Sequence, residues 1–214
     1  MTIITPGASI PSIPLDRTLE RFGQIQKLIF QRKYQTGTTL NTLPVPLRDP
    51  KLRATWTALL AAVNSTKVTV STFIQEPENS AGEARMYGGG NATINGIEIV
   101  LGVNPSPFTA KVLETKQHVV KALKQLIAEG ANLAVYLVNE HGQIGCLSNN
   151  NDGTATEYRP IPIRSFFVGD KVFGNFENVD SNDLSFVFEP NFSNDFDVVT
   201  PTDFNPLHDL SNPI

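Results

Sequence analysis

Cysteine, histidine and tryptophan are scarce in this 214-residue chain. The single cysteine, Cys146, cannot form a disulfide within the chain, and three scattered histidines cannot complete a conventional Cys/His zinc cluster. No run approaches the roughly 20 consecutive apolar residues of a membrane-spanning helix. The N-terminus also lacks the basic and apolar regions of a signal peptide. We therefore expect a soluble protein without disulfides, zinc modules or membrane spans.

Motifs that fix a catalytic activity or a cofactor are missing as well. The sequence has no nucleophile elbow and no dinucleotide fingerprint. Its glycine run, Gly88–Gly90, continues as Asn-Ala-Thr-Ile instead of the Lys-Ser/Thr of a phosphate loop. The segment 148–157 matches only part of the EF-hand pattern. Glu140 and His141 lie on a predicted turn, where they are exposed, whereas general acid/base catalysis needs a cleft. We expect no enzyme and no cofactor.

The composition supports a folded core, because 40% of the residues are hydrophobic and only 18% are charged. The run at residues 25–34 predicts a strand, as does KVTVSTFI at residues 67–74. Asn95-Gly96 predicts a tight hairpin turn before the strand IEIVLGV. A second hairpin is expected over residues 132–147, and three further strands follow from residue 158 to residue 190.

Two helices are predicted between these strands. Residues 50–63 place Trp56 and several leucines on one helical stripe, and Asp49 is a candidate cap. Residues 107–129 form the second helix, which ends before Gly130. The fold class is therefore α+β, with a sandwich-like or barrel-like β-rich core of about seven to nine short strands, two packed helices and extended terminal arms.

Three segments follow from this organisation. Residues 1–18 contain three prolines and predict an N-terminal arm. Residues 19–190 form the core domain, from which the polar loop at residues 75–91 projects. Residues 191–214 mix aromatic residues, acids and prolines, which is typical of an acidic C-terminal arm that packs its aromatics onto a neighbour.

Charge is divided unevenly along the chain. The net charge of −4 combines +5 over residues 1–130 with −9 over residues 131–214. One interpretation is that the acids are solvated loop residues that maintain solubility. The other is that the basic part of one copy meets the acidic part of the next, in a heterologous contact that builds rings or stacks. The acidic balance argues against specific nucleic-acid binding, which needs a dense basic surface.

Four segments carry a resemblance to a known class: FGQIQKLIFQRKY, GEARMYGGGN, NEHGQIG and VDSNDLSFVFEPNFSNDFDVVTPTDFNPL. They are similar to segments of virion structural proteins of tailed bacteriophages and prophages of Bacteroidetes-like hosts. The resemblance implies a virion component, assembled in the host cytoplasm, whose partners are copies of itself and other virion proteins. Tail-tube and neck or connector subunits fit best, and a minor capsid or decoration protein is the alternative. An acidic wall also suits a conduit for DNA, because it repels phosphates.

The candidate assembly contacts are three glycines of the projecting loop, three phenylalanines of the C-terminal arm and two of its acids. They are Gly88, Gly89, Gly90, Phe192, Phe196, Phe204, Asp195 and Asp197. A carbohydrate-binding or receptor-binding module is a further alternative. The chain offers few aromatic side chains on which such a ligand could stack, namely Tyr87, Tyr136 and Tyr158, since Trp56 is assigned to the core.

Overall fold

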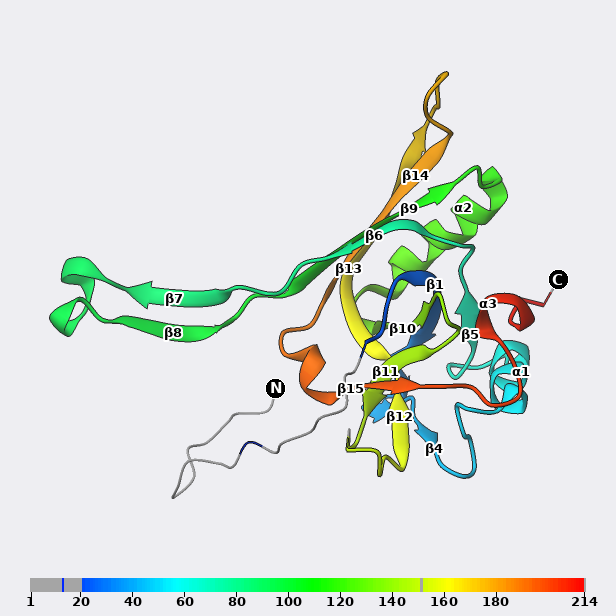
Figure 1. The fold of residues 1–214 in the computed structure, drawn as a ribbon, viewed down its shortest axis with the longest axis horizontal. Helices are drawn as coiled ribbons and strands as arrows, with labels where there is room; N and C mark the ends of the chain where they lie inside the picture. The colour runs from blue at the N-terminus through cyan, green and yellow to red at the C-terminus, as the bar shows by residue number, and fades with distance from the viewer. Residues whose placement is uncertain (1–12, 14–20, 151, 214) are drawn as a thin grey trace.

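The computed structural model describes residue 13, residues 21–150 and residues 152–213. Within them, eleven strands form one large antiparallel sheet (Figure 1). Its main path runs in the order β4 (Leu43–Pro44), β12 (Glu157–Arg159), β11 (Ile144–Ser148), β10 (Leu133–Asn139), β13 (Ile161–Val172), β14 (Ser181–Phe188), β9 (Ser106–Leu113) and β6 (Gln75–Asn79).

The sheet branches at two places. β1 (Ile25–Arg32) pairs with β10 and with β5 (Val68–Val70), and β15 (Phe196–Val199) pairs with β11. Two small sheets stand apart: β2 (Tyr34–Thr36) with β3 (Thr39–Leu40), and β7 (Ala84–Gly88) with β8 (Glu98–Val103). The helices are α1 (Arg53–Ala61), α2 (Gln117–Gln125) and α3 (Pro206–Asp209), and the 3₁₀ turns are η1 (Gly90–Ala92), η2 (Ile94–Gly96), η3 (Leu126–Asn132) and η4 (Phe192–Asp195).

β10 lies at the centre of the sheet and is buried along its whole length. Its residues alternate between two cores, because successive side chains of a strand point to opposite faces. Leu133, Val135 and Leu137 join a first core formed with β1, β9, β13, β14 and α2. Tyr136 and Val138 join a second core beneath α1 and α3. A strand covered on both faces needs the uninterrupted apolar run that β10 has.

Trp56 fixes α1 to the second core. The side chain is fully buried, and its ring meets that of Tyr136 edge-on at a centroid distance of 5.1 Å. The indole Nε1 donates a hydrogen bond to the carbonyl of Pro50 at 2.9 Å, which satisfies its polar atom. The predicted helix at residues 50–63 is confirmed in type, but α1 spans only Arg53–Ala61. Asp49 does not cap it: the backbone N–H of Arg53 donates to Asp203 Oδ1 instead.

The strand count and the number of helices differ from the sequence prediction. The described residues form fifteen strands and three α-helices, where about seven to nine strands and two helices were expected from the spacing of apolar runs. One branched antiparallel sheet takes the place of the expected sandwich or barrel. The excess arises from short strands of two to five residues, which carry too little periodicity to be recognised.

The predicted helix over residues 107–129 is wrong in its first half. Residues 106–113 form β9, in which Phe108, Ala110 and Val112 are buried while Pro107 and Thr109 are exposed. This alternation has the period of a strand. Only α2 and the 3₁₀ turn η3 occupy the rest of the segment. The hairpin predicted over residues 132–147 is confirmed as β10 and β11.

The predicted terminal arms have different outcomes. The N-terminal arm, residues 1–18, lies outside the described residues apart from Ile13. From residue 191 onward the described chain packs on its own body: β15 pairs with β11, and Val199, Leu207 and Leu210 are buried in the second core. The predicted acidic C-terminal arm, residues 191–214, is therefore in its described part a segment that completes the fold of its own chain.

Candidate assembly surfaces

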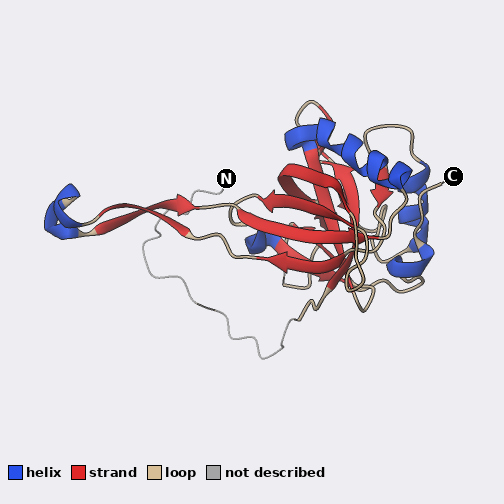
Figure 2. Cartoon of the chain, turned by 90° about the horizontal axis from the view of Figure 1, so that it is seen from above, coloured by secondary structure: helices blue, strands red, loops and turns tan. Residues whose placement is uncertain are grey.

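The most exposed regular structure in the molecule is the two-stranded ribbon of β7 and β8, residues 84–103. It leaves the body after β6 and returns into β9, and both views show it extended away from the large sheet (Figures 1 and 2). The projecting segment is thus a paired ribbon rather than the unpaired loop predicted over residues 75–91, because residues 75–79 belong to β6.

The ribbon's end is held by a compact turn. Asn95 and Gly96 both have positive φ, as the sequence predicted for a tight turn. Thr93 Oγ1 accepts a hydrogen bond from the N–H of Gly89 and donates one to the carbonyl of Ile97. Gly88 has a φ of +101°, and a Cβ at this position would collide with the side chain of Thr93. The glycines therefore shape the turn that ends the ribbon.

Apolar side chains cover both faces of the ribbon and lie in solvent. Ile99, Val100 and Leu101 follow one another in β8, and each is more than half exposed. Ile99 and Val100 pair in register with Tyr87 and Met86, so they point to opposite faces. Met86 and Tyr87 are exposed on β7, and Ile94 and Ile97 are exposed at the turn. An isolated two-stranded hairpin is marginally stable in water, and an exposed apolar patch marks an interaction site. The ribbon consequently presents uncovered apolar surface.

A second group of exposed aromatic residues lies where β13 turns into β14. We call residues 172–180 the phenylalanine tip, which stands at the end of these two strands (Figure 1). Phe173 is 81% exposed, and Phe176 is completely exposed. Val172 and Val179 flank them and are about half exposed. The tip therefore presents an apolar surface of its own.

The phenylalanine tip is braced by polar contacts. Asp180 accepts hydrogen bonds from the Gly174 N–H at 2.8 Å and from Lys171 Nζ at 2.7 Å, and these contacts lower the pKa of its carboxyl. Asn175 Oδ1 accepts from the N–H groups of Glu177 and Asn178. These contacts brace the backbone of the loop that carries the two phenylalanines.

The aromatic residues predicted as contacts of a C-terminal arm pack within the chain instead. Phe192 stacks on Phe188 at a centroid distance of 4.4 Å, and Phe196 meets Phe22 edge-on at 5.6 Å. Phe204 is partly buried against the second core. That these three side chains also contact another copy stays a prediction.

The acids of this segment are likewise engaged inside the chain. Asp195 forms an ion pair with Arg159 at 2.9 Å, and Asp197 Oδ1 accepts from the N–H of Val198. Lys33 in the basic part of the sequence pairs with Glu189 in the acidic part, at 3.3 Å. Part of the predicted charge complementarity is therefore used within one molecule.

Sequence analysis missed the apolar faces of the ribbon and the phenylalanine tip. The run Ile97–Val103 has the composition of a buried strand, and no local pattern distinguishes a buried strand from an exposed ribbon. The available signal was Asn175-Phe176-Glu177-Asn178, an aromatic residue among turn formers.

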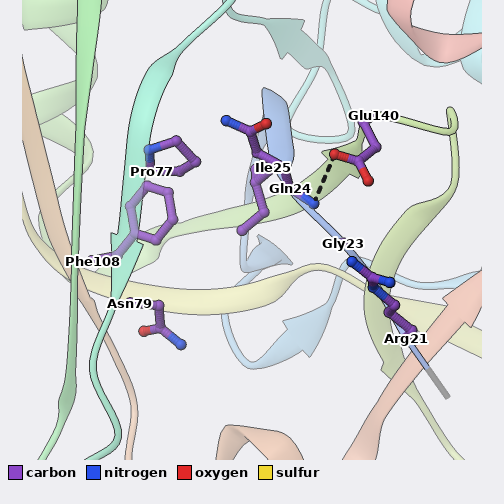
Figure 3. Close-up of a pocket in the computed structure, with 8 residues that line it drawn as sticks. All are labelled: Arg21, Gly23, Gln24, Ile25, Pro77, Asn79, Phe108 and Glu140. Atoms are coloured by element: carbon purple, nitrogen blue, oxygen red, sulfur yellow. Dashed lines mark hydrogen bonds between the residues drawn. The ribbon is translucent and has the colours of Figure 1, made fainter. Parts of the chain in front are cut away.

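A cavity of 410 Å³ opens between β6 and the start of β1 (Figure 3). Pro77 and Phe108 line one side, and Arg21 and Glu140 lie at the other. Glu140 Oε2 accepts a hydrogen bond from the N–H of Gln24 at 3.3 Å. Arg21 and Glu140 are the two charged residues of the lining.

The three histidines are exposed and separate: His118 is on α2, His141 on the β10–β11 turn and His208 on α3. In the described part of the chain, no three His, Cys, Asp or Glu side chains are grouped to hold a metal ion. None of the described helices is long and apolar enough to cross a membrane.

Comparison with known proteins gives a structural similarity. No protein-family model and no curated protein matches the sequence. Among solved structures, the chain is similar to one described as "Tail of empty GTA particle computed with helical refinement, C6 symmetry". The two share 12% sequence identity over 62% of this chain and 88% of that chain, with a TM-score of 0.32. A likeness at this score does not establish a shared fold, so the ribbon and the phenylalanine tip must carry any functional argument.

Proposed function

We propose that this chain is a non-enzymatic structural subunit of a phage virion, which assembles with copies of itself into rings or stacks as a tail-tube or neck component. The observation that carries the proposal is the β7–β8 ribbon, whose apolar residues are exposed on both faces. The virion setting comes from the sequence resemblance, and the Bacteroidetes-like host group stays a prediction.

Burial explains why the ribbon favours assembly. Removing apolar surface from water contributes about 25 cal/mol per Å², and neither face of the ribbon is covered within one chain. Two strands can extend across a neighbouring subunit without enlarging the core of either. A surface of this kind suits a subunit whose contacts repeat from copy to copy.

The acidic part of the chain supports a tail or neck position. Residues 131–214 carry a net charge of −9, and a wall of that sign repels the phosphates of DNA that passes it. A minor capsid or decoration protein could use the same ribbon, and imaging of the assembled particle separates the two positions. A carbohydrate-binding or receptor-binding module is less favoured, because Tyr136 and Tyr158 are buried, which leaves Tyr87 as the one exposed platform of the three tyrosines named above.

The test compares the solution mass of the wild-type protein across a concentration series with that of the double variant Ile99→Thr/Leu101→Thr. Both side chains are exposed on β8, and threonine retains β propensity while removing apolar surface. Leu47→Ser is the matched control, because Leu47 is 83% exposed but lies outside the ribbon.

We expect the wild type and the control to form rings, tubes or stacks in negative-stain images, and the ribbon variant to stay smaller at every concentration. A wild-type protein that remains a monodisperse monomer would overturn self-assembly. A ribbon variant that assembles as well as the control would exclude the ribbon as the interface.

A further inference from the structure

The turn at the end of the ribbon contains an asparagine followed by a glycine, Asn95-Gly96, a pair that occurs once in the sequence. Asn95 is exposed and has a φ of 62°. A tight turn favours this pair, because both of its central residues take positive φ. The same pair is chemically reactive, since glycine has no side chain to shield its backbone nitrogen from the asparagine amide. The turn therefore places a reactive pair on the surface that the proposed function assigns to assembly.

The reaction is a deamidation within the backbone of the turn. The backbone nitrogen of Gly96 gives its proton to a solvent base and attacks the side-chain Cγ of Asn95. The bond from Cγ to the amide nitrogen then breaks, and the nitrogen takes a proton from solvent and leaves as ammonia. Water opens the resulting succinimide ring at one of its two carbonyl carbons, which gives either aspartate or isoaspartate. One water is consumed for each ammonia released, and nothing is oxidised or reduced.

Hydrogen bonds of the closed turn restrain this reaction. The Gly96 N–H donates to the Thr93 carbonyl at 3.1 Å, and Thr93 Oγ1 donates to the Ile97 carbonyl. The Gly96 nitrogen must leave its hydrogen bond before it can lose its proton and attack. The ribbon opens readily, because residues 84–103, all of them described, contribute no buried side chain to either core. The rate of deamidation therefore depends on how often the turn opens.

We propose that Asn95 is a site of spontaneous deamidation in the free subunit, and that burial of the ribbon in an assembly suppresses the reaction. The site follows from the turn itself, whereas its protection by other copies rests on the proposed function. Isoaspartate adds a carbon atom to the backbone of the tight turn, and aspartate adds a negative charge between the exposed Ile94 and Ile97. Both products disturb an apolar interface, so subunits that stay free lose the ability to assemble.

Peptide mapping of aged protein by mass spectrometry tests the site, with the wild type kept dilute enough to remain monomeric. Asn91 is the matched control within the same molecule. It is exposed at the same end of the ribbon, and the N–H that follows it, of Ala92, also donates to a backbone carbonyl at 3.1 Å. We expect Asn95 to deamidate at least about tenfold faster, a difference of about 1.4 kcal/mol in the barrier. Equal or slower deamidation at Asn95 would overturn the inference and leave the proposed function intact.

A second measurement compares free and assembled wild-type protein of the same age, separated by size before digestion. A turn that opens only when one buried isoleucine is exposed opens at least about tenfold less often. We therefore expect deamidation at Asn95 to be slower by at least that factor in the assembled fraction. Equal rates in the two fractions would overturn the protection. Absence of assembly at all concentrations would overturn the proposed function and the protection together, while the rate in the monomer would still decide whether Asn95 is the site.

Asn95→Gly provides a variant that cannot form the succinimide ring. Two successive glycines also suit a turn with two positive φ values, so the ribbon keeps its end. Asn91→Gly is the control, because it removes the other exposed asparagine and leaves the reactive pair. We expect ageing as free subunits to reduce the later assembly of the wild type and of Asn91→Gly, and to leave that of Asn95→Gly unchanged. An equal loss in all three proteins would contradict the effect assigned to the deamidated turn.

Discussion

The side-chain amide of Asn212 hydrogen-bonds both backbone groups of Val70. Asn212 Nδ2 donates to the Val70 carbonyl at 2.7 Å, and Asn212 Oδ1 accepts from the Val70 N–H at 2.8 Å. β5 pairs with β1 along its other edge, so the amide occupies the position of a further strand. A free strand edge is a template for unwanted pairing. Asn212 both attaches the end of the chain and closes that edge.

The first prediction concerns this amide. Asn212→Ala should lower the free energy of unfolding by about 1–2 kcal/mol, because both backbone groups of Val70 lose their partner. Asn212→Asp should have an intermediate effect, since the acceptor remains and the donor is lost. Urea unfolding followed by the fluorescence of Trp56 measures the change. Ser211→Ala, at the exposed neighbouring position, is the control, and equal stability of the two alanine variants would contradict the assigned role.

The second prediction concerns Leu207, which is 5% exposed and belongs to the second core. Leu207→Ala should lower the free energy of unfolding by about 2–5 kcal/mol, the range for a buried leucine. His208→Ala at the exposed neighbour should change it little. Removal of residues 196–214 should abolish the cooperative transition, because β15 and three buried side chains are lost. An unchanged transition in the truncated protein would show that this segment does not belong to the core.

The sequence predicted some elements of the fold, but not the packing of the C-terminal residues. The hairpin of β10 and β11 was predictable, because two apolar runs surround the turn Asn139–Gly142. The helix α1 was also predictable, because Trp56 and several leucines lie on one helical stripe. By contrast, Asn205 and the two prolines near it suggested a segment without regular structure. Leu207 is buried because it packs into the second core, whose other residues are distant in the sequence. No local pattern encodes that packing.

The assembly surfaces were only partly predictable. Gly88 was predicted as an assembly contact, and that role stays a prediction; the structure shows that it shapes the turn at the end of the ribbon. The ribbon's apolar faces were not recognised, because a strand awaiting a partner and a strand buried in a core have the same composition. β9 was mistaken for a helix, since Ser106 and Ala110 are small and weaken the strand alternation. In each case tertiary contacts outweighed the local signal.

The third prediction separates the ribbon from the core. Gly88→Ala should disturb the turn, because its φ of +101° and the nearby Thr93 leave no room for a Cβ. The midpoint of thermal unfolding should change by less than about 2 °C, since the ribbon lies outside both cores, whereas assembly should weaken. Gly37→Ala is the control, with a positive φ but open space around it. A large loss of thermal stability in Gly88→Ala would show that the ribbon is coupled to the core.

The fourth prediction concerns Lys27, which is 8% exposed and forms no ion pair with a described carboxylate. Its Nζ donates to the carbonyl of Leu207 and lies 4.7 Å from the centroid of the Phe73 ring. Burial lowers the pKa of this amine below the ordinary 10.5, because desolvation disfavours the charged form. Between the lowered pKa and 10.5 the unfolded chain holds a proton that the folded chain has released.

The free energy of unfolding should therefore rise with pH across that interval, by about 1.4 kcal/mol for each unit by which folding lowers the pKa of Lys27. Lys27→Met keeps the length of the side chain and removes this contribution. Burial raises the pKa of Tyr136 and of Cys146, which acts in the opposite direction, but in both proteins alike. The stability of the methionine variant relative to the wild type should consequently decline as the pH approaches 10.5. Urea unfolding of both proteins at several pH values measures it, and a difference that is constant with pH would mean that Lys27 titrates equally in the folded and unfolded chains.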